Sequence, residues 1–213
     1  MCTFTFGKFK DVPIKDVFEQ QPGYLTWVIK QRWFKDKFRQ EYQLCVSLVN
    51  EARSSTMKPI REHDIVIYTD GACSNNGSPL AKAGIGVHFS KRNKLLFQDS
   101  SEPVSSSVKP TNQRAELLAI LKALRIVKEV DHTIIIYTDS DYSIKCITEW
   151  YPSWLKQGTL DKKKNIDLIQ PIAQYYGALT VEFRHIHSHT GLQDEHSLGN
   201  EEADRLATLA LSN

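Results

Sequence analysis

The spacing of apolar residues predicts a helical first part of the chain and a mixed second part. Over residues 16–49, apolar positions such as Leu25 and Val28 recur at near-helical spacing. Two later helices are predicted, PTNQRAELLAILKALRIVKEV with Thr111 as N-cap and GNEEADRLATLALSN with Asn200 as N-cap. Five short strand-like runs predict strands: DIVIYTDG, AGIGVHFS, KLLFQDSS, HTIIIYTDSD and GALTVEFRHIHSH. Strands that come first and then alternate with helices indicate an α/β fold with a sheet of mixed direction.

A polar stretch, NEARSSTMKPIREHD, separates the two parts. Its serines, threonine and proline are typical of a linker. We therefore expect a small module at residues 1–50, a linker at 51–63 and a larger domain at 64–213. A chain of 213 residues is long enough for one such domain and a smaller unit.

The composition is that of an ordinary globular protein, with 41% apolar and 24% charged residues. No apolar run approaches the ~20 residues that span a bilayer, and the N-terminus lacks the apolar segment of a secretory signal. The four cysteines lie far apart, which is typical of reduced thiols rather than of a disulfide framework. We expect an intracellular monomer, cytoplasmic or nuclear.

Charge is distributed unevenly along the chain. Residues 1–60 carry ten Lys or Arg against six Asp or Glu, whereas residues 61–213 carry seventeen against nineteen. The segment WYPSWLKQGTLDKKKNID adds a local basic run to the larger part. An anionic partner fits this distribution, although a charge run is more often a solvated face.

Carboxylates mark the ends of two similar segments, IVIYTDG and IIIYTDS. Each run is apolar on both faces, and Asp70 and Asp139 follow where it stops. They are either turn formers or ligand-binding groups at the edge of a sheet. Glu116 lies on the packing face of its predicted helix, where a glutamate needs compensation. Asp204 lies near the start of the last helix, where an acid usually complements the helix dipole.

Four acids that converge on one point would need cations to neutralise them. Carboxylate oxygens favour hard divalent ions, Mg²⁺ or Mn²⁺. Two such ions about 4 Å apart can stabilise both the attacking and the leaving oxygen of a phosphodiester displacement.

Four motifs in register resemble the type 1 ribonuclease H family: YTDGACSNNG, PTNQRAELLA, YTDSDYSIK and SHTG…LGNEEADRLA. The resemblance covers residues 64–213. It implies the ribonuclease H fold, a five-stranded mixed sheet flanked by helices. It also implies endonucleolytic hydrolysis of the RNA strand of RNA–DNA hybrids by two Mg²⁺ ions, with 5′-phosphate and 3′-hydroxyl products.

The resemblance also assigns roles to individual residues. Asp70 would bridge both metal ions, Glu116 and Asp139 would share one ion, and Asp204 would complete the other. His189 in SHTG would be the catalytic histidine that aids proton transfer or product departure.

Seven further residues would contact the hybrid by the same resemblance. Three of them would reach bases and sugars in the minor groove, where the 2′-hydroxyls of RNA are displayed; capping and turn chemistry is the alternative for such polar residues. Three would form a phosphate pocket for the DNA strand, and one would lie on the basic protrusion. In that order they are Asn76, Asn112 and Gln113; Lys109, Thr111 and Asn165; and Trp154.

The histidines around His189 leave the assignment of the catalytic histidine open. LQDEHS makes the link from His189 to Asp204 about five residues longer than in most relatives, so His196 is a possible substitute. His185, His187 and His189 share one strand face, which would also suit a structural zinc site.

The first part of the chain, FTFGKFKDVPIKDVFEQQPGYLTWVIKQRWF, resembles the small C-terminal module of exonuclease X-like proteins. Its lysines beside Phe6, Phe9 and Trp33 suit nucleic-acid binding. The alternative is a small core with the lysines as solvated charges, formed by Phe4, Phe6, Leu25, Trp27 and Ile29. Docking of a protein, such as a replication protein, is the third interpretation.

Two other functions remain for the larger domain, a nuclease of the same fold that cuts DNA and a hybrid-binding protein without activity. The minor-groove residues argue against the first. The complete set of four acids argues against the second, because binding alone does not require them.

Overall fold

The computed structural model describes residues 2–104 and 108–212, which form two compact units. The larger unit comprises Glu62–Ser188 and the chain from Asp194 onward. The smaller unit comprises the chain up to Arg61 together with a short distant segment, His189–Gln193.

The larger unit is built on a five-stranded sheet in the order β3-β2-β1-β4-β5. Strand β1 pairs antiparallel with β2, which pairs antiparallel with β3. On its other side β1 pairs parallel with β4, and β4 pairs parallel with β5. The predicted mixed sheet is therefore confirmed. The strands are β1 (Ile65–Ser74), β2 (Lys82–Phe89), β3 (Ser100–Pro103), β4 (Ile134–Thr138) and β5 (Val181–His185).

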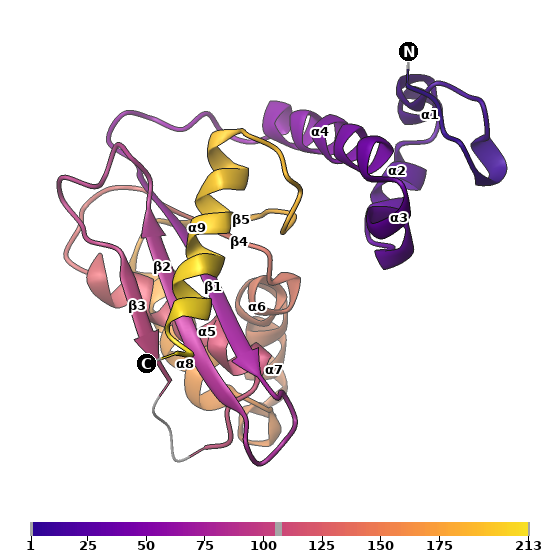
Figure 1. The fold of residues 1–213 in the computed structure, drawn as a ribbon. Coiled ribbons are helices and arrows are strands. Elements are labelled where there is room, and N and C mark those ends of the chain that lie inside the picture. The colour runs from indigo at the N-terminus through magenta and orange to yellow at the C-terminus, as the bar shows by residue number, and fades with distance from the viewer. Residues whose placement is uncertain (1, 105–107, 213) are drawn as a thin grey trace. The chain divides into compact units, whose positions relative to one another are not determined.

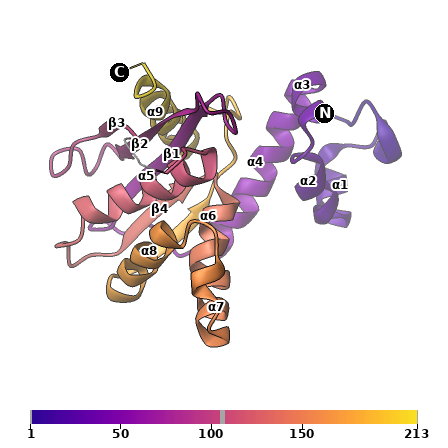
Figure 2. The same ribbon diagram turned by 90° about the horizontal axis from the view of Figure 1, so that it is seen from below.

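Helices cover both faces of this sheet. Figures 1 and 2 show α9 on one face and α5 and α8 on the other. The helices are α5 (Asn112–Ile126), α6 (Asp141–Lys145), α7 (Tyr151–Gln157), α8 (Ile166–Ala178) and α9 (Glu195–Leu209). Across the described residues, none of the helices combines the length and the apolar character needed to cross a membrane.

The core of the larger unit lies between the sheet and α5 with α8. Strand residues Ile67 and Ile136 pack there with Leu117 and Ile120 of α5 and Ile169 of α8, all fully buried. Each such side chain contributes roughly 1.5–3 kcal/mol relative to an exposed one. Because β1 and β4 are central, their long apolar runs are buried, as the sequence predicted.

Two predicted boundaries were wrong. KLLFQDSS is not a strand, since residues 91–96 form turns and β3 begins only at Ser100. The Asn93 carbonyl accepts hydrogen bonds from the Leu96 and Phe97 amides, and Leu95 is 97% exposed. Asn200 is not the N-cap of α9. The cap is Asp194, whose side chain accepts from the His196 and Ser197 amides. Thr111 is the N-cap of α5 as predicted.

The smaller unit is mostly helical, as predicted for residues 16–49. Its helices are α1 (Ile14–Gln20), α2 (Pro22–Val28), α3 (Arg32–Lys37) and α4 (Arg39–Thr56). Phe4, Leu25 and Ile29 lie in its core, which also holds Phe34 of α3. Trp27 is 51% exposed. The small-core interpretation therefore describes most of the apolar side chains of this unit.

Candidate active site

Acidic side chains from β1, α5 and the end of β4 meet at one edge of the sheet. Asp70, Glu116 and Asp139 each bring one carboxylate oxygen within 4.8 Å of the others. Asp204 of α9 joins them, since its charge and a side-chain hydrogen bond both raise the pKa of Asp70. The structure thus brings together the four acids singled out in the sequence. They are called the active-site acids below.

Strand register explains why two of these acids are neighbours. Tyr68 of β1 pairs with Tyr137 of the parallel strand β4. Asp70 and Asp139 follow these tyrosines by two residues each, so they lie at equivalent positions. This is the carboxyl edge of the sheet, where ligands bind in open α/β folds.

Two glycines allow the helices to deliver the other two acids. A Cβ atom on Gly71 would lie 2.2 Å from the Glu116 amide nitrogen of α5. Gly86 pairs with Asp70 across β1 and β2, and a Cβ atom there would lie 2.0 Å from the Ala203 carbonyl oxygen of α9. Larger residues would push both helices away. Sequence reasoning missed this role, although glycines inside strands signal a close approach of backbone.

Burial and mutual repulsion dominate the electrostatics of the active-site acids. Burial, followed by the charges of Asp139 and Asp204, raises the pKa of Asp70 to about 7. The Gly71 N–H donates to Asp70 Oδ1 at 2.7 Å and opposes this rise. Burial, then Asp70 and Asp139, raises the pKa of Glu116 well above its ordinary value. A divalent cation would relieve this repulsion.

The donor set fits such a cation. Glu116 Oε2 is buried and has no hydrogen-bond partner among the described residues. Its other oxygen, Oε1, accepts from Asn112 Nδ2 at 3.4 Å. The active-site acids therefore offer carboxylate oxygens, the ligands that Mg²⁺ and Mn²⁺ prefer.

A second group with metal-ligand spacing, His88, Asp99 and Glu202, has a different character. We call it the His88 cluster. Asp99 Oδ2 lies 2.8 Å from His88 Nδ1 and 3.5 Å from Lys94 Nζ. Burial acts to raise the pKa of Asp99, but the Phe89 N–H, His88 and Lys94 hold it below its ordinary value. Two guanidinium hydrogen bonds from Arg205, each 2.8 Å long, lower the pKa of Glu202.

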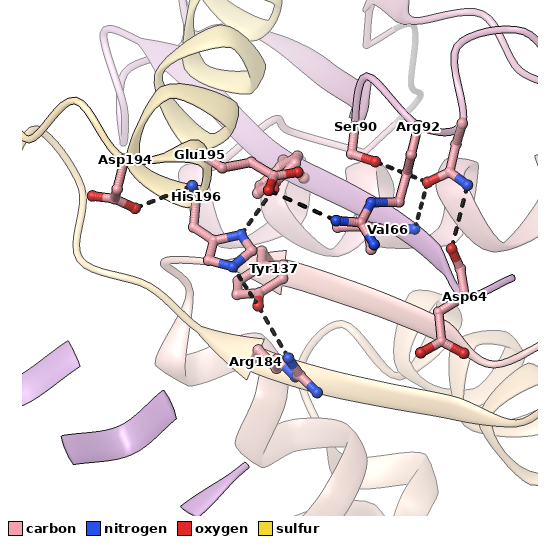
Figure 3. Close-up of polar contacts among 11 residues, drawn as sticks. Asp64, Val66, Ser90, Arg92, Tyr137, Arg184, Asp194, Glu195 and His196 are labelled. Carbon is pink, nitrogen blue, oxygen red and sulfur yellow. Dashed lines mark hydrogen bonds and ion pairs between the residues drawn. The ribbon is translucent and has the colours of Figure 1, made fainter. Parts of the chain in front are cut away.

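His196 is held by hydrogen bonds and ring stacking (Figure 3). Its Nδ1 lies 2.9 Å from the Tyr68 hydroxyl and its Nε2 lies 3.2 Å from the Tyr137 hydroxyl. The ring stacks on Tyr137 with centroids 4.3 Å apart, and Arg184 donates to the Tyr137 hydroxyl at 3.2 Å. Burial lowers the pKa of His196. Both ring nitrogens are therefore used to join the start of α9 to β1 and β4.

The other histidines between residues 185 and 196 have different surroundings. His185 and His187 contact each other edge to face, with ring centroids 5.1 Å apart. Neither belongs to the two groups with metal-ligand spacing that the described residues contain. His189 has a positive φ of 50° and belongs to the smaller unit.

Residues expected in the minor groove gather at the start of α5. Asn76 Oδ1 accepts from the Asn112 amide at 3.3 Å, and Asn112 in turn reaches Glu116. Gln113 is exposed, as are Asn76 and Asn112. Lys109 Nζ donates to the Gly77 carbonyl, which ties the two loops together.

Arg114, which sequence reasoning missed, connects the residues expected in the phosphate pocket. Its amide donates to Thr111 Oγ1 at 3.3 Å, and its guanidinium donates to Asn165 Oδ1 at 3.4 Å. A bidentate pair with Asp167, at 2.9 and 2.6 Å, fixes the guanidinium. Arg114 is buried. The available signal in the sequence was the arginine in NQRAE, for which an acid at the start of α8 is the partner.

On the basic protrusion, the Trp154 ring is partly buried against the core of the larger unit. The Lys163 ammonium lies 5.1 Å from the ring centroid, within the range of a cation–π contact. This leaves a lysine beside an aromatic ring at the predicted nucleic-acid surface.

Comparisons with known proteins agree with this geometry. The family model described as RNase H matches residues 62–212, and the model described as exodeoxyribonuclease X-like C-terminal matches residues 4–32. Ribonuclease H from Maricaulis maris (strain MCS10) is 35% identical over 152 residues, which cover 70% of this chain and 93% of that protein. Ribonuclease H1 from Rattus norvegicus is 35% identical over 148 residues, 67% of this chain and 48% of that protein.

The chain thus spans about half the length of the mammalian relative. Among solved structures, the solution structure of the PFV RNase H domain superposes with a TM-score of 0.57 at 26% identity, over 70% of this chain and 94% of that domain. Fold, family models and relatives agree for the larger unit, and the chain belongs to the RNase H family.

Proposed function

We propose that this protein is an endonuclease that hydrolyses the RNA strand of RNA–DNA hybrids. The convergence of Asp70, Glu116, Asp139 and Asp204 at one buried sheet edge is the observation that carries the proposal. Relatives that match the larger unit are named ribonuclease H, which supports the choice of substrate.

The active-site acids would hold two Mg²⁺ ions, with Mn²⁺ as a possible substitute. When bound, these ions supply the charge stabilisation and the activated water that phosphodiester hydrolysis requires. Asp70 would be a ligand of these ions together with its neighbours Asp139 and Asp204, whose charges both raise the pKa of its carboxyl. The hydrolysis would leave a 5′-phosphate and a 3′-hydroxyl.

The chain itself orients the acids and moves the proton. The Gly71 N–H holds one oxygen of Asp70, and Asn112 holds one oxygen of Glu116, so both carboxylates are oriented by the chain. His189 would aid proton transfer or product departure.

Hybrid recognition would begin next to these acids. Asn112 contacts both Asn76 and Glu116, so a minor groove that meets these amides would present its 2′-hydroxyls near the acids. Gln113 would extend this surface. Lys109, Thr111 and Asn165 would receive a phosphate of the DNA strand, and Trp154 with its neighbouring lysines would follow the backbone.

The test is incubation of the full chain with labelled RNA–DNA hybrid, duplex RNA and duplex DNA, in Mg²⁺ and in EDTA. We expect cleavage of the hybrid alone, in Mg²⁺ alone, with product 3′ ends that a polymerase can extend. Cleavage of duplex DNA would overturn the choice of substrate. Tight hybrid binding without any cleavage in Mg²⁺ or Mn²⁺ would identify a binding protein instead.

A further inference from the structure

The segment after Ser188 packs with the smaller unit, although it lies between β5 and α9 in sequence. His189–Gln193 group with the chain up to Arg61. Leu192 packs against the apolar core that α1 to α4 enclose. A loop that the RNase H resemblance makes flexible therefore has a hydrophobic anchor in the N-terminal module.

A specific hydrogen bond accompanies this anchor. Gln43 of α4 donates from Nε2 to the Thr190 carbonyl oxygen at 3.3 Å. Thr190 is 2% exposed, and its hydroxyl accepts from the Leu192 amide at 3.2 Å. One carbonyl and one hydroxyl of Thr190 thus fix the turn that follows His189.

The backbone of the segment matches this close packing. Gly191 has a φ of 71°, and a Cβ atom there would lie 2.9 Å from Gln43 Nε2 and 3.3 Å from an Arg39 guanidinium nitrogen. The positive φ favours glycine at this position. His189 itself has a φ of 50°, a region that non-glycine residues adopt rarely and that the adjoining turn must stabilise.

We propose that the N-terminal module positions the catalytic histidine loop, with Gln43 as a positioning residue and Leu192 as the apolar anchor. The inference rests on the role of His189 in the proposed function. By restricting residues 189–193, α4 lowers the entropy that the loop must lose when His189 acts. Helix α4, which follows the exonuclease X-like residues 4–32, then serves turnover through the loop.

Gln43→Glu tests the hydrogen bond with little change in shape, because a carboxylate cannot donate to the Thr190 carbonyl. Gln40→Glu is the matched control, since it makes the same charge change at an exposed position of the same helix. A neutral hydrogen bond is worth about 0.5–1.5 kcal/mol, so kcat should fall about 2- to 10-fold in Gln43→Glu. KM for the hybrid should stay unchanged, and Gln40→Glu should match the wild type.

Hydrogen exchange gives a readout that does not depend on activity. In the metal-free full chain, the amides of residues 190–193 should exchange faster in Gln43→Glu than in Gln40→Glu. Leu192→Ala should accelerate the same amides further. Equal exchange and equal kcat in the two glutamate variants would overturn the inference.

A double-mutant cycle separates positioning from a general loss of stability. In a His189→Ala background, Gln43→Glu should have no further effect on kcat. An equal loss in both backgrounds would mean that Gln43 acts elsewhere and would refute the inference. The proposed function is tested separately: it fails if Asp139→Asn retains full turnover. The hydrogen-exchange result does not depend on the outcome of that test.

Discussion

The active-site acids and the His88 cluster have the same spacing and opposite electrostatics. In each, three potential ligand atoms lie within 4.8 Å of one another. Lys94 and Arg205 contact the carboxylates of the His88 cluster, and the pKa values of these two carboxyls are lowered. Asp70 and Glu116 are buried among like charges, and their pKa values are raised. Spacing alone therefore does not distinguish the two groups. The repulsion that raises the pKa values of Asp70 and Glu116, in contrast to the relief that Lys94 and Arg205 give the His88 cluster, favours a cation at the active-site acids.

The largest expected difference between the two groups is in turnover. Asp139→Asn should lower cleavage of the hybrid by roughly 10³-fold, because metal ions supply several kcal/mol of transition-state stabilisation and about 1.4 kcal/mol is tenfold in rate. Asp99→Asn, the matched change in the His88 cluster, should leave kcat within about twofold of the wild type. Single-turnover cleavage of a labelled hybrid measures both.

Hybrid binding is the control for that comparison. Asp139→Asn should retain the affinity for hybrid, measured in Ca²⁺ so that no cleavage occurs. Undiminished turnover in Asp139→Asn would contradict the assignment of the active site.

The second largest expected difference between the two groups is in the stabilisation of the fold by Mg²⁺. A ligand at 100 times its Kd stabilises the folded state by about 2.7 kcal/mol, so Mg²⁺ should raise the Tm of the wild type. Glu116→Gln should lose most of this increase, because it removes a carboxylate of the active-site acids. Glu202→Gln should keep it. Thermal melts over a Mg²⁺ titration test this, and an increase lost in Glu202→Gln would place the ion at the His88 cluster.

The pH dependence of stability in EDTA should have opposite signs at Asp70 and Asp99. The pKa of Asp70 rises from 3.8 in the unfolded chain to about 7 in the fold, so its contribution favours folding at acid pH and is lost as the pH rises through 7. Asp70→Asn should therefore be more stable than the wild type at pH 8, by roughly 1–3 kcal/mol. This advantage should shrink toward pH 5.

Asp99 has a lowered pKa, so its contribution is present above pH 3.8 and is lost as the pH falls. Asp99→Asn should be less stable than the wild type at pH 8, by about 1 kcal/mol. Urea unfolding at pH 5 and pH 8 measures both variants. A change in the free energy of unfolding of the same sign in both variants at pH 8 would contradict the electrostatic difference between the two groups.

Lys94→Met should have the smallest effect. Lys94 is about half exposed, and exposed ion pairs contribute no more than about 1 kcal/mol. The free energy of unfolding should change by less than about 0.5 kcal/mol. Mg²⁺ should not stabilise the His88 cluster in this variant, because Arg205 still neutralises Glu202. If Lys94→Met binds Mg²⁺ at the His88 cluster, Lys94 alone accounts for the different affinity of the two groups for Mg²⁺.

The sequence predicted the positions of Asp70 and Asp139 because strand ends follow directly from two apolar runs. It did not predict the turn after β2, because that turn depends on Asn93, whose side chain bonds the distant Val66 amide. It also misplaced the start of α9. Asn200 looks like a cap, but Gly199 packs on the Tyr68 ring and His196 lies between two tyrosines, so tertiary contacts extend the helix to Asp194.

The helix-borne acids were predicted only in part. The apolar face of α5 predicted the direction of Glu116, but Gly71, which sets its approach, has this role only once α5 is packed on β1. The contacts of His196 likewise depend on Tyr68 and Tyr137, which lie far away in sequence.

The placement of Leu192 has a consequence for how such a chain can evolve. The two units are separated in sequence near residue 61, yet Leu192, which follows β5, packs against the core of the smaller unit. Recombination between relatives at the linker would pair α4 with a foreign loop. Substitutions at Gln43, Gly191 and Leu192 should therefore covary among proteins that share both modules, and chains that lack the first module should be free to vary at the last two.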